Sequence, residues 1–157
     1  MVRKPDALVK RLDDLSPPPL LAVIAHAEMA MERALQAHLQ DAGFGDQTLA
    51  QSRLFGAIPP EGIRLTYLAE RAQLTKQAVG ELIDQMEAAG YVTRSPDPVD
   101  ARAKLIGFTS KGWRAVDAAL AAFGDMEAQL LKQFGADRLA TTREVLELTP
   151  SVLAAAD

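Results

Sequence analysis

Cysteine is absent from the 157 residues of this chain, which excludes disulfide bonds, catalytic thiols and zinc sites with cysteine ligands. Aromatic residues are also scarce, at 5 %, although hydrophobic residues in total make up 48 %. This composition is typical of a helical protein rich in Ala and Leu, and it is unusual for a β-sandwich or a barrel. The length suits one compact domain, or one domain with an added association element, because single cores hold roughly 100–200 residues.

Histidine is almost absent too, since only His26 and His38 are present. On one continuous helix these positions lie about 18 Å apart, so the two side chains cannot share a metal ion or a proton. The sequence also lacks a nucleophilic serine elbow, a glycine-rich phosphate-binding loop and a paired histidine motif. We therefore expect a protein that is not an enzyme and that uses no metal and no cofactor.

Long apolar runs are missing as well. No segment approaches the roughly 20 apolar residues that a membrane span needs, and the charged N-terminus has no apolar signal core. We therefore expect a cytoplasmic protein without a membrane partner. Residues 1–19 are expected to form an N-terminal arm that stops at three consecutive prolines, Pro17 to Pro19.

Apolar residues at helical spacing predict a long helix from Leu20 to about Gln40, ended by residues 41–45, and a shorter helix over residues 47–57. The stripe of the long helix comprises Leu20, Ile24, Ala27, Met31 and Leu35.

Two more helices are expected near the C-terminus. Ser110 is a candidate cap for a long helix, and a last helix after Gly135 is expected to be kinked or interrupted at Pro150. The stripe of the first of these comprises Trp113, Val116, Leu120, Phe123, Met126, Leu130 and Phe134.

The middle of the chain predicts a helix-turn-helix. Thr66 is a candidate cap for a short helix, a turn passes through residues 73–74, and Thr75 is a candidate cap for a second helix that stops at Gly90. Helical periodicity places Val79, Leu82, Ile83 and Met86 on the inner face of that second helix, and Lys76, Gln77, Gly80, Glu81 and Asp84 on the outer face.

The N-terminal end of the second helix offers hydrogen-bonding side chains where the helix dipole is positive. In a helix-turn-helix this end enters the major groove, where Gln77 is suited to an adenine edge and Lys76 to a guanine edge or a phosphate. Gly80 fits either a close approach to DNA or simple tolerance of a small residue. The acidic residues Glu81 and Asp84 are expected to lie away from the duplex.

A hairpin is predicted after Gly90, with strands at Tyr91–Arg94 and Lys104–Phe108 and a tip rich in Pro and Asp. We expect Arg102, with Arg94 and Lys104, to contact DNA, and arginine at such a tip is suited to a narrow minor groove. Asp100 is expected to orient Arg102. A solvated turn with ordinary surface charges is the alternative interpretation of this hairpin.

Charge is unevenly distributed along the chain. The net charge is −4, yet residues 62–114 carry 8 Lys or Arg against 6 Asp or Glu. A local excess of this sign is what a DNA-contacting segment needs.

The run LAERAQLTKQAVGELIDQMEAAGYVTRSPDPVDARAKLIGFTSKG resembles the MarR family of bacterial transcriptional regulators. It contains, in order, a helix-turn-helix, a glycine–aromatic strand entry, an Asp-x-Arg wing and a Leu-Thr-x-x-Gly helix start in which Phe108 replaces Leu. The resemblance extends from about Leu20 to the C-terminus. It implies a mainly α, winged helix-turn-helix fold (α+β) with a two-stranded wing.

The resemblance further implies a DNA-binding region at residues 46–109, with the recognition helix at about 75–89 and the wing at about 91–109. Thr75, Lys76, Gln77 and Gly80 fall on that helix, and Asp100 and Arg102 on the wing. Residues 20–45 and 110–157 would form a helical dimerisation region.

By the same resemblance the chain would act as a homodimer on a pseudo-palindromic operator in double-stranded DNA, with recognition helices about 34–36 Å apart. It would regulate transcription as a repressor and leave DNA when a small aromatic or phenolic effector binds. The candidate ligand-pocket residues are His26, Arg33, Ser52 and Arg53.

A second interpretation is a winged-helix module for protein association that binds DNA weakly or not at all. The net charge of −4 and the acidic pair Glu81 and Asp84 favour it. The two interpretations differ in whether duplex binding exists and depends on salt.

Overall fold

The structure is a computed structural model that describes residues 16–100 and 102–154. The predicted arm therefore lies outside the described residues except for its last four positions. The described elements are α2 (Leu20–Asp41), α3 (Leu49–Phe55), β1 (Ile63–Arg64), α4 (Leu65–Ala72), α5 (Lys76–Ala88), β2 (Val92–Pro96), β3 (Lys104–Phe108), α6 (Ser110–Phe134) and α7 (Ala136–Ala154). None of these helices is both long and apolar enough to cross a bilayer.

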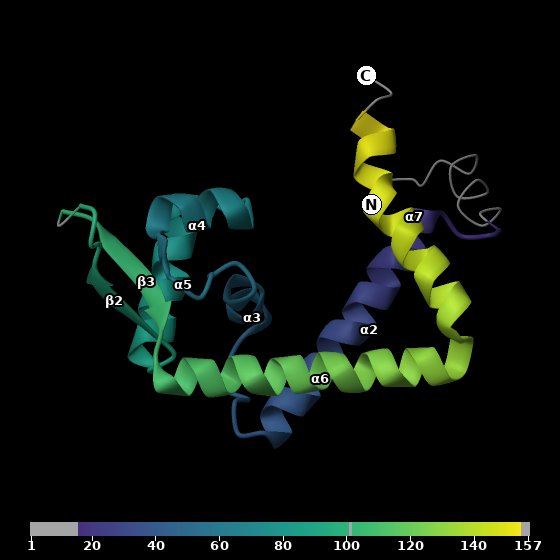
Figure 1. The fold of residues 1–157 in the computed structure, drawn as a ribbon, viewed down its shortest axis with the longest axis horizontal. Helices are drawn as coiled ribbons and strands as arrows, with labels where there is room; N and C mark the ends of the chain where they lie inside the picture. The colour runs from purple at the N-terminus through teal and green to yellow at the C-terminus, as the bar shows by residue number, and fades with distance from the viewer. Residues whose placement is uncertain (1–15, 101, 155–157) are drawn as a thin grey trace, which may run out of the picture.

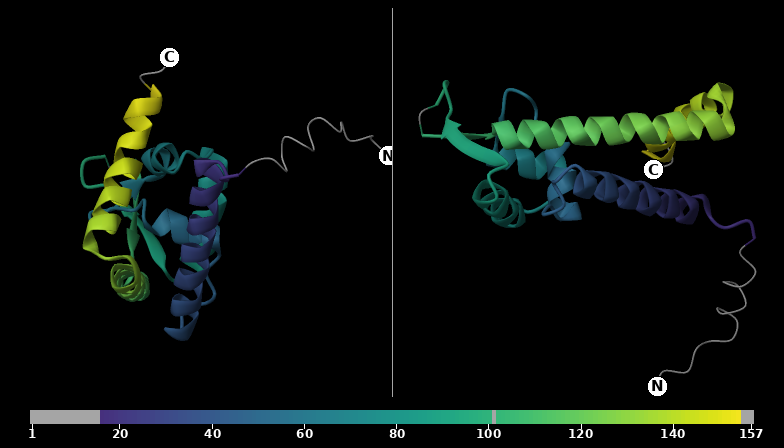
Figure 2. Two further views of the ribbon diagram at one scale, coloured as in Figure 1. Left: turned by 90° about the vertical axis from the view of Figure 1, so that its right-hand side faces the viewer. Right: turned by 90° about the horizontal axis from the view of Figure 1, so that it is seen from below.

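Helix α6 is the axis of the molecule (Figure 1). The short helices and the sheet gather at its N-terminal end, and α7 turns away from it at the C-terminal end. Helix α2 packs against α6 and crosses it at an angle (Figure 1). In the view from below the two lie in adjacent layers (Figure 2). The fold is thus a small α+β head at one end of a set of long helical arms.

The hydrophobic core lies in the head. The inner face predicted for residues 75–89 is confirmed, because Val79, Ile83 and Met86 are buried and Leu82 packs partly against them. The other large, fully buried side chains are Leu54, Leu68, Tyr91, Val92 and Ile106. Burial of these side chains joins α3, α4, α5 and the sheet into one unit.

The sheet has three strands in the order β1-β3-β2, all antiparallel. Strands β2 and β3 form the predicted two-stranded wing, and β1 is an additional strand that was not predicted. The hairpin itself is confirmed, but its first strand runs over Val92–Pro96 rather than Tyr91–Arg94, because Pro96 still pairs opposite Lys104 instead of lying in the tip. At the other end of the hairpin, Val92 lies opposite Phe108. Strand β1 could not be predicted from the sequence, because a strand of two residues is too short to show alternating apolar and polar residues. At its entry, Gly62 has a φ of +86°, and a Cβ there would lie 3.1 Å from the carbonyl oxygen of Ile106.

Of the three predicted helix caps in this region, two differ in the structure and one is confirmed. Helix α4 begins at Leu65 rather than after Thr66, because the chain passes directly from β1 into the helix and Arg64 takes the N-cap position. Helix α6 is capped by Thr109 rather than Ser110. The Thr75 cap is confirmed, since its hydroxyl accepts the N–H of Ala78.

The remaining predictions of helices hold with small changes. The end of α2 at residues 41–45 is confirmed, and the helix predicted over 47–57 is shorter because Thr48 and Gln51 form a capping box that starts it at Leu49. Pro150 does not interrupt α7, which contains it as one continuous helix.

The arms leave much of their apolar surface uncovered within the chain. Helix α7 has no buried residue among those described, and in the predicted stripe of α6 Leu120 is 60 % exposed and Phe134 50 % exposed. In α2, Met31 is 46 % exposed. Monomeric proteins rarely expose contiguous apolar surface of this kind, so these faces are suited to contact with another surface.

Candidate nucleic-acid interface

Helix α5 presents its N-terminal turn to solvent. Thr75, Lys76 and Gln77 are all exposed, and the Thr75 hydroxyl lies 3.2 Å from the amide nitrogen of Ala78. The Gln77 amide donates to the Glu81 carboxylate at 3.1 Å. Because α5 is packed against the core by its opposite face, this end has a fixed direction, and the positive end of its dipole faces outward.

The position of α5 depends on a sharp turn from α4. Gln73 takes a left-handed conformation with a φ of 54°, and the amide of Leu74 then donates to the carbonyl of Ala69 at 3.0 Å. Gly80, for which a glycine-specific reason was considered, meets nothing closer than Leu65 Cδ2 at 4.0 Å when a Cβ is added. Packing inside the chain therefore does not require glycine at position 80.

A groove of about 390 Å³ separates the start of α5 from the hairpin. Four cationic side chains line it: Arg64 from β1, Lys76 from α5, Arg94 from β2 and Lys104 from β3. Thr66 adds a hydroxyl from the first turn of α4. The topology thus brings together basic residues that are spread over 41 positions of the sequence.

Two of the four cations already have partners within the chain. Arg94 pairs with Glu87 and lies 2.6 Å from Asp84, and Arg64 lies 2.6 Å from Asp97. Within the described part of the chain, neither Lys76 nor Lys104 forms an ion pair. Arg94 therefore serves in this structure to hold β2 against α5, while the two lysines remain open to an external anion.

The hairpin tip carries Arg102 into solvent, and its conformation rests on two carboxylates. Asp100 was expected to orient Arg102, and its Oδ1 accepts the backbone N–H of Arg102 at 3.1 Å. Asp97, which sequence reasoning missed, is buried and bonded to Arg64. The Val99 amide and the Arg64 guanidinium hold the pKa of Asp97 below its usual range.

Tyr91 joins this head to α6. Its hydroxyl donates to Asp46, the Lys111 ammonium lies 3.9 Å from its ring centre, and its carbonyl accepts the amide of Thr109 at 3.0 Å. The bond from Tyr91 is the main cause that lowers the pKa of Asp46, and burial is the main cause that raises the pKa of Tyr91. The orientation of the head on α6 is therefore fixed by side chains from three segments.

The start of α6, with the sequence Phe-Thr-Ser-Lys-Gly at residues 108–112, has a physical explanation. The Thr109 hydroxyl donates to the carbonyl of Gly90 at 2.6 Å and accepts the amide of Gly112 at 3.1 Å. A Cβ at Gly112 would lie 2.1 Å from the carbonyl oxygen of Tyr91. Only glycine lets the first turn of α6 approach the strand entry this closely.

The four candidate ligand-pocket residues do not converge on one site. Ser52 lines a cavity of about 170 Å³ between α2, α3 and α6. Arg53 lies outside it and pairs with Glu28 and Glu32, and the exposed His26 and Arg33 are on other faces of α2.

Gln47, which was not among the candidates, also lines the cavity beside Ser52. Within the described residues, Ser52 Oγ and Gln47 Nε2 are buried side-chain atoms without a hydrogen bond of good geometry, although the Gln47 side chain lies near enough to the Tyr91 hydroxyl to counter in part the rise in the pKa of Tyr91. Such atoms are rare in native interiors and call for an explanation.

Comparison with known proteins agrees with this architecture. A MarR family model matches residues 46–103. The transcriptional regulator HosA of Escherichia coli O111:H- is 34 % identical over 76 residues, which span 48 % of this chain and 56 % of HosA.

Among solved structures, the reduced form of MarR from E. coli superposes with a TM-score of 0.69 and 26 % identity, covering 83 % of this chain and 96 % of MarR. A mutant of Staphylococcus aureus MepR bound to an oligodeoxyribonucleotide shares the fold, with a TM-score of 0.56, 22 % identity, and coverage of 86 % of this chain and 98 % of MepR. This fold and this family are those of transcription regulators. Residues 46–103 thus match the MarR family model, and most of the chain superposes on MarR, so this chain is similar to MarR family regulators in its winged helix and in its fold.

Proposed function

We propose that this protein binds duplex DNA as a symmetric homodimer and thereby represses transcription. The observation that carries the proposal is the groove with four cations between the start of α5 and the hairpin, because a groove of this charge matches a phosphate backbone. The oligodeoxyribonucleotide bound by the MepR mutant, a protein of the same fold, supports the same use of this surface. The DNA-binding region would span residues 46–109.

Each predicted contact residue then has a distinct role. Lys76 and Lys104, which have no ion pair among the described residues, would take phosphates from the backbone in the groove. Thr75 and Gln77 on the exposed end of α5 would face base edges in the major groove, with Gly80 one turn further along. Arg102 at the tip would enter the minor groove.

Arg94 and Asp100 would act within the protein. Arg94 forms ion pairs with two carboxylates and would place β2 against α5. Its contribution to DNA binding would be to form part of the groove wall. Asp100 would fix the backbone at Arg102. The acidic residues Glu81 and Asp84 would limit how deeply α5 enters the duplex.

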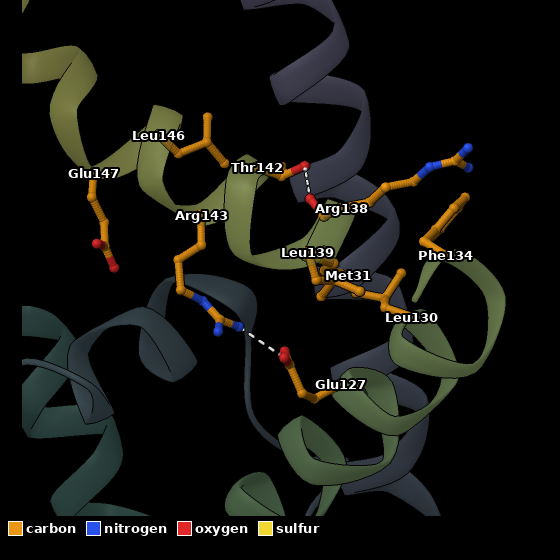
Figure 3. A pocket seen from close by; sticks show the side chains of 10 residues that line it. All are labelled: Met31, Glu127, Leu130, Phe134, Arg138, Leu139, Thr142, Arg143, Leu146 and Glu147. Atoms are coloured by element: carbon orange, nitrogen blue, oxygen red, sulfur yellow. Dashed lines mark hydrogen bonds and ion pairs between the residues drawn. The ribbon is translucent and has the colours of Figure 1, made fainter. Parts of the chain in front are cut away.

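The dimer would form through α2, α6 and α7, the region of residues 20–45 and 110–157. These helices enclose an open recess of about 630 Å³ whose apolar wall includes Met31, Leu130, Phe134, Leu139 and Leu146 (Figure 3). Arg143 and Glu127 form an ion pair of 2.8 Å at its rim. A second copy of the chain is the occupant we propose, since the recess continues into the exposed apolar faces of α6 and α7 and stable dimers bury about 1,200–2,000 Å².

The cavity beside Ser52 would receive a small effector. Its apolar walls and its two unpartnered polar atoms suit a small aromatic ligand with a hydroxyl or a carbonyl. Because the cavity lies between the arms and the head, an occupant that prefers one orientation of the head would shift the equilibrium between DNA-binding and released forms.

Duplex binding is tested by a salt titration with a DNA selected from a random pool. We expect the logarithm of the affinity to fall linearly with the logarithm of salt concentration. Arg102→Ala is expected to weaken binding by about 1–3 kcal/mol and to leave the melting temperature nearly unchanged, as measured by fluorescence anisotropy and thermal unfolding. The matched control, Arg33→Ala, removes the same charge from α2 and is expected to bind normally. No binding at low salt would instead support the association module.

The effector cavity is tested with phenol as a probe. Phenol is expected to raise the melting temperature of the wild type, because a ligand that binds the folded state stabilises it. Ala119→Leu adds three carbons to the cavity wall and is expected to abolish this shift, whereas Ala121→Leu on the exposed side of the same helix is expected to keep it. An equal phenol shift in all three proteins would place phenol elsewhere.

A further inference from the structure

We propose that Arg64 and Asp97 form a clamp that sets the position of the hairpin tip and thereby places Arg102 on the duplex. This inference rests on the proposed DNA binding and adds two positioning residues to it. Both were absent from the sequence-based candidates. Asp97 places a buried negative charge beside a surface that would otherwise attract phosphate, so a structural role must offset its effect on DNA binding.

The Asp97 carboxylate is bonded on both oxygens. Its Oδ2 lies 2.6 Å from Nε and 2.6 Å from Nη2 of Arg64, and its Oδ1 accepts the amide of Val99 at 2.8 Å. The Asp97 amide donates to the carbonyl of Ala103 at 3.1 Å, which closes the loop between β2 and β3. A single residue thus fixes the start of the tip, the turn after it and the far end of the loop.

The partner of Asp97 comes from the other edge of the sheet. Arg64 lies in β1, which pairs with β3, whereas Asp97 follows β2 directly, so the ion pair spans the order β1-β3-β2. Arg64 also precedes α4 without a break. The clamp therefore ties the hairpin tip to the helix-turn-helix rather than only to its own strands.

A second link reaches Arg102 itself. Arg64 Nη1 lies 4.0 Å from Asp100 Oδ2, and the other oxygen of Asp100 accepts the backbone amide of Arg102 at 3.1 Å. The contacts of Arg64 with Asp97 are charge-assisted hydrogen bonds partly shielded from water, which hold geometry better than isolated surface ion pairs, whereas its contact with Asp100 is a longer ion pair. The Arg64 guanidinium at the start of α4 thus contacts two carboxylates, those of Asp97 and Asp100. Asp100 in turn accepts a hydrogen bond from the backbone of Arg102.

The clamp and simple electrostatics predict effects of opposite sign for Asp97→Asn. Removing a negative charge near DNA strengthens binding if charge alone matters, because phosphate repulsion falls. If Asp97 positions the tip, the same change weakens binding to the selected duplex, and we expect a loss of about tenfold, within the range for one lost contact. Glu70→Gln is the control: it removes one exposed acidic charge from α4 and is expected to leave binding equal or slightly stronger.

The effect must also pass through Arg102. In an Arg102→Ala background, Asp97→Asn is expected to cause no further loss, whereas damage to the whole fold would weaken binding in both backgrounds. Arg64→Gln is expected to weaken binding at least as much as Asp97→Asn, because it also removes a cation from the groove, and the double variant is expected to lose no more than Arg64→Gln alone. Stronger binding by Asp97→Asn, or additive losses, would overturn the clamp.

A measurement without DNA separates the clamp from the proposed function. The chain has no cysteine, so Val99→Cys, at a side chain that is 90 % exposed, accepts a single spin label on the tip. We expect the label to give a broad, restricted spectrum when Asp97 is present and a sharper, mobile one after Asp97→Asn or Arg64→Gln. Unchanged label mobility would refute the clamp, whereas absence of duplex binding by the wild type would refute the proposed function alone.

Discussion

Replacing Gly112 with alanine is expected to destabilise the protein by roughly 3 kcal/mol or more, the upper end of what overpacking costs. The added Cβ would lie 2.1 Å from the carbonyl oxygen of Tyr91 and 3.1 Å from Phe108 Cδ1. The nearest obstacle is backbone, so no side-chain rotation relieves it. Separating α6 from the strand entry would also strain the bonds from Thr109 to Gly90 and Tyr91.

Thermal unfolding measures this effect, since 3 kcal/mol corresponds to about 6–12 °C in a chain of this size. Gly124 in the same helix provides the matched control, because a Cβ there meets nothing within 4 Å. Gly124→Ala is expected to raise stability by up to about 1 kcal/mol through its helix propensity. Losses of equal size at both positions would show that the close approach at Gly112 is not the cause.

Phe134→Glu is expected to convert the proposed dimer into monomers and to lower affinity for a two-site duplex at least a hundredfold. Phe134 is 50 % exposed within one chain and lines the recess that we propose a second copy fills. Burying an unpaired carboxylate there would cost several kcal/mol, which exceeds the margin of most interfaces. Loss of the second binding site removes the gain from linking two half-sites.

Sedimentation equilibrium at micromolar concentration measures the mass directly. Val99→Glu is the control, because it introduces the same charge at the most exposed of the large apolar side chains, on the hairpin and away from the recess. It is expected to leave the mass unchanged, whatever its effect on DNA. A wild type that is monomeric, or a Phe134→Glu variant that remains dimeric, would contradict the assignment of this surface.

The sequence predicts the structure best where a local pattern of residues decides which element forms. The cap at Thr75, the buried Val79, Ile83 and Met86, and the presence of the hairpin follow from capping chemistry and from periods of 3.6 and 2, whereas the pairing of its strands does not. The assignment of Lys76, Gln77 and Arg102 to DNA contact stays a prediction, as the experiments above have still to test it.

Sequence reasoning was weakest wherever the partner is distant along the chain. The sequence around Asp97, a Pro-Asp-Pro turn, gives no sign of its ion pair, because the partner is Arg64, 33 positions earlier. The helical pattern indicates Ser52 as a polar ligand-pocket candidate, but it does not indicate Gln47, which lines the same cavity. The apolar stripe of α6 was found, but the sequence could not say that Leu120 and Phe134 lie outside the core.

By itself, then, the order of residues determined the main helices, the hairpin and the apolar face of each helix, because caps, turns and periodicity act over a few neighbours. Only the tertiary structure decided which charges neutralise each other, which polar atoms are left without partners and which apolar faces are left uncovered. Those outcomes depend on contacts between segments far apart in the chain, and no local pattern encodes the distance between Arg64 and Asp97 or the approach of Gly112 to Tyr91.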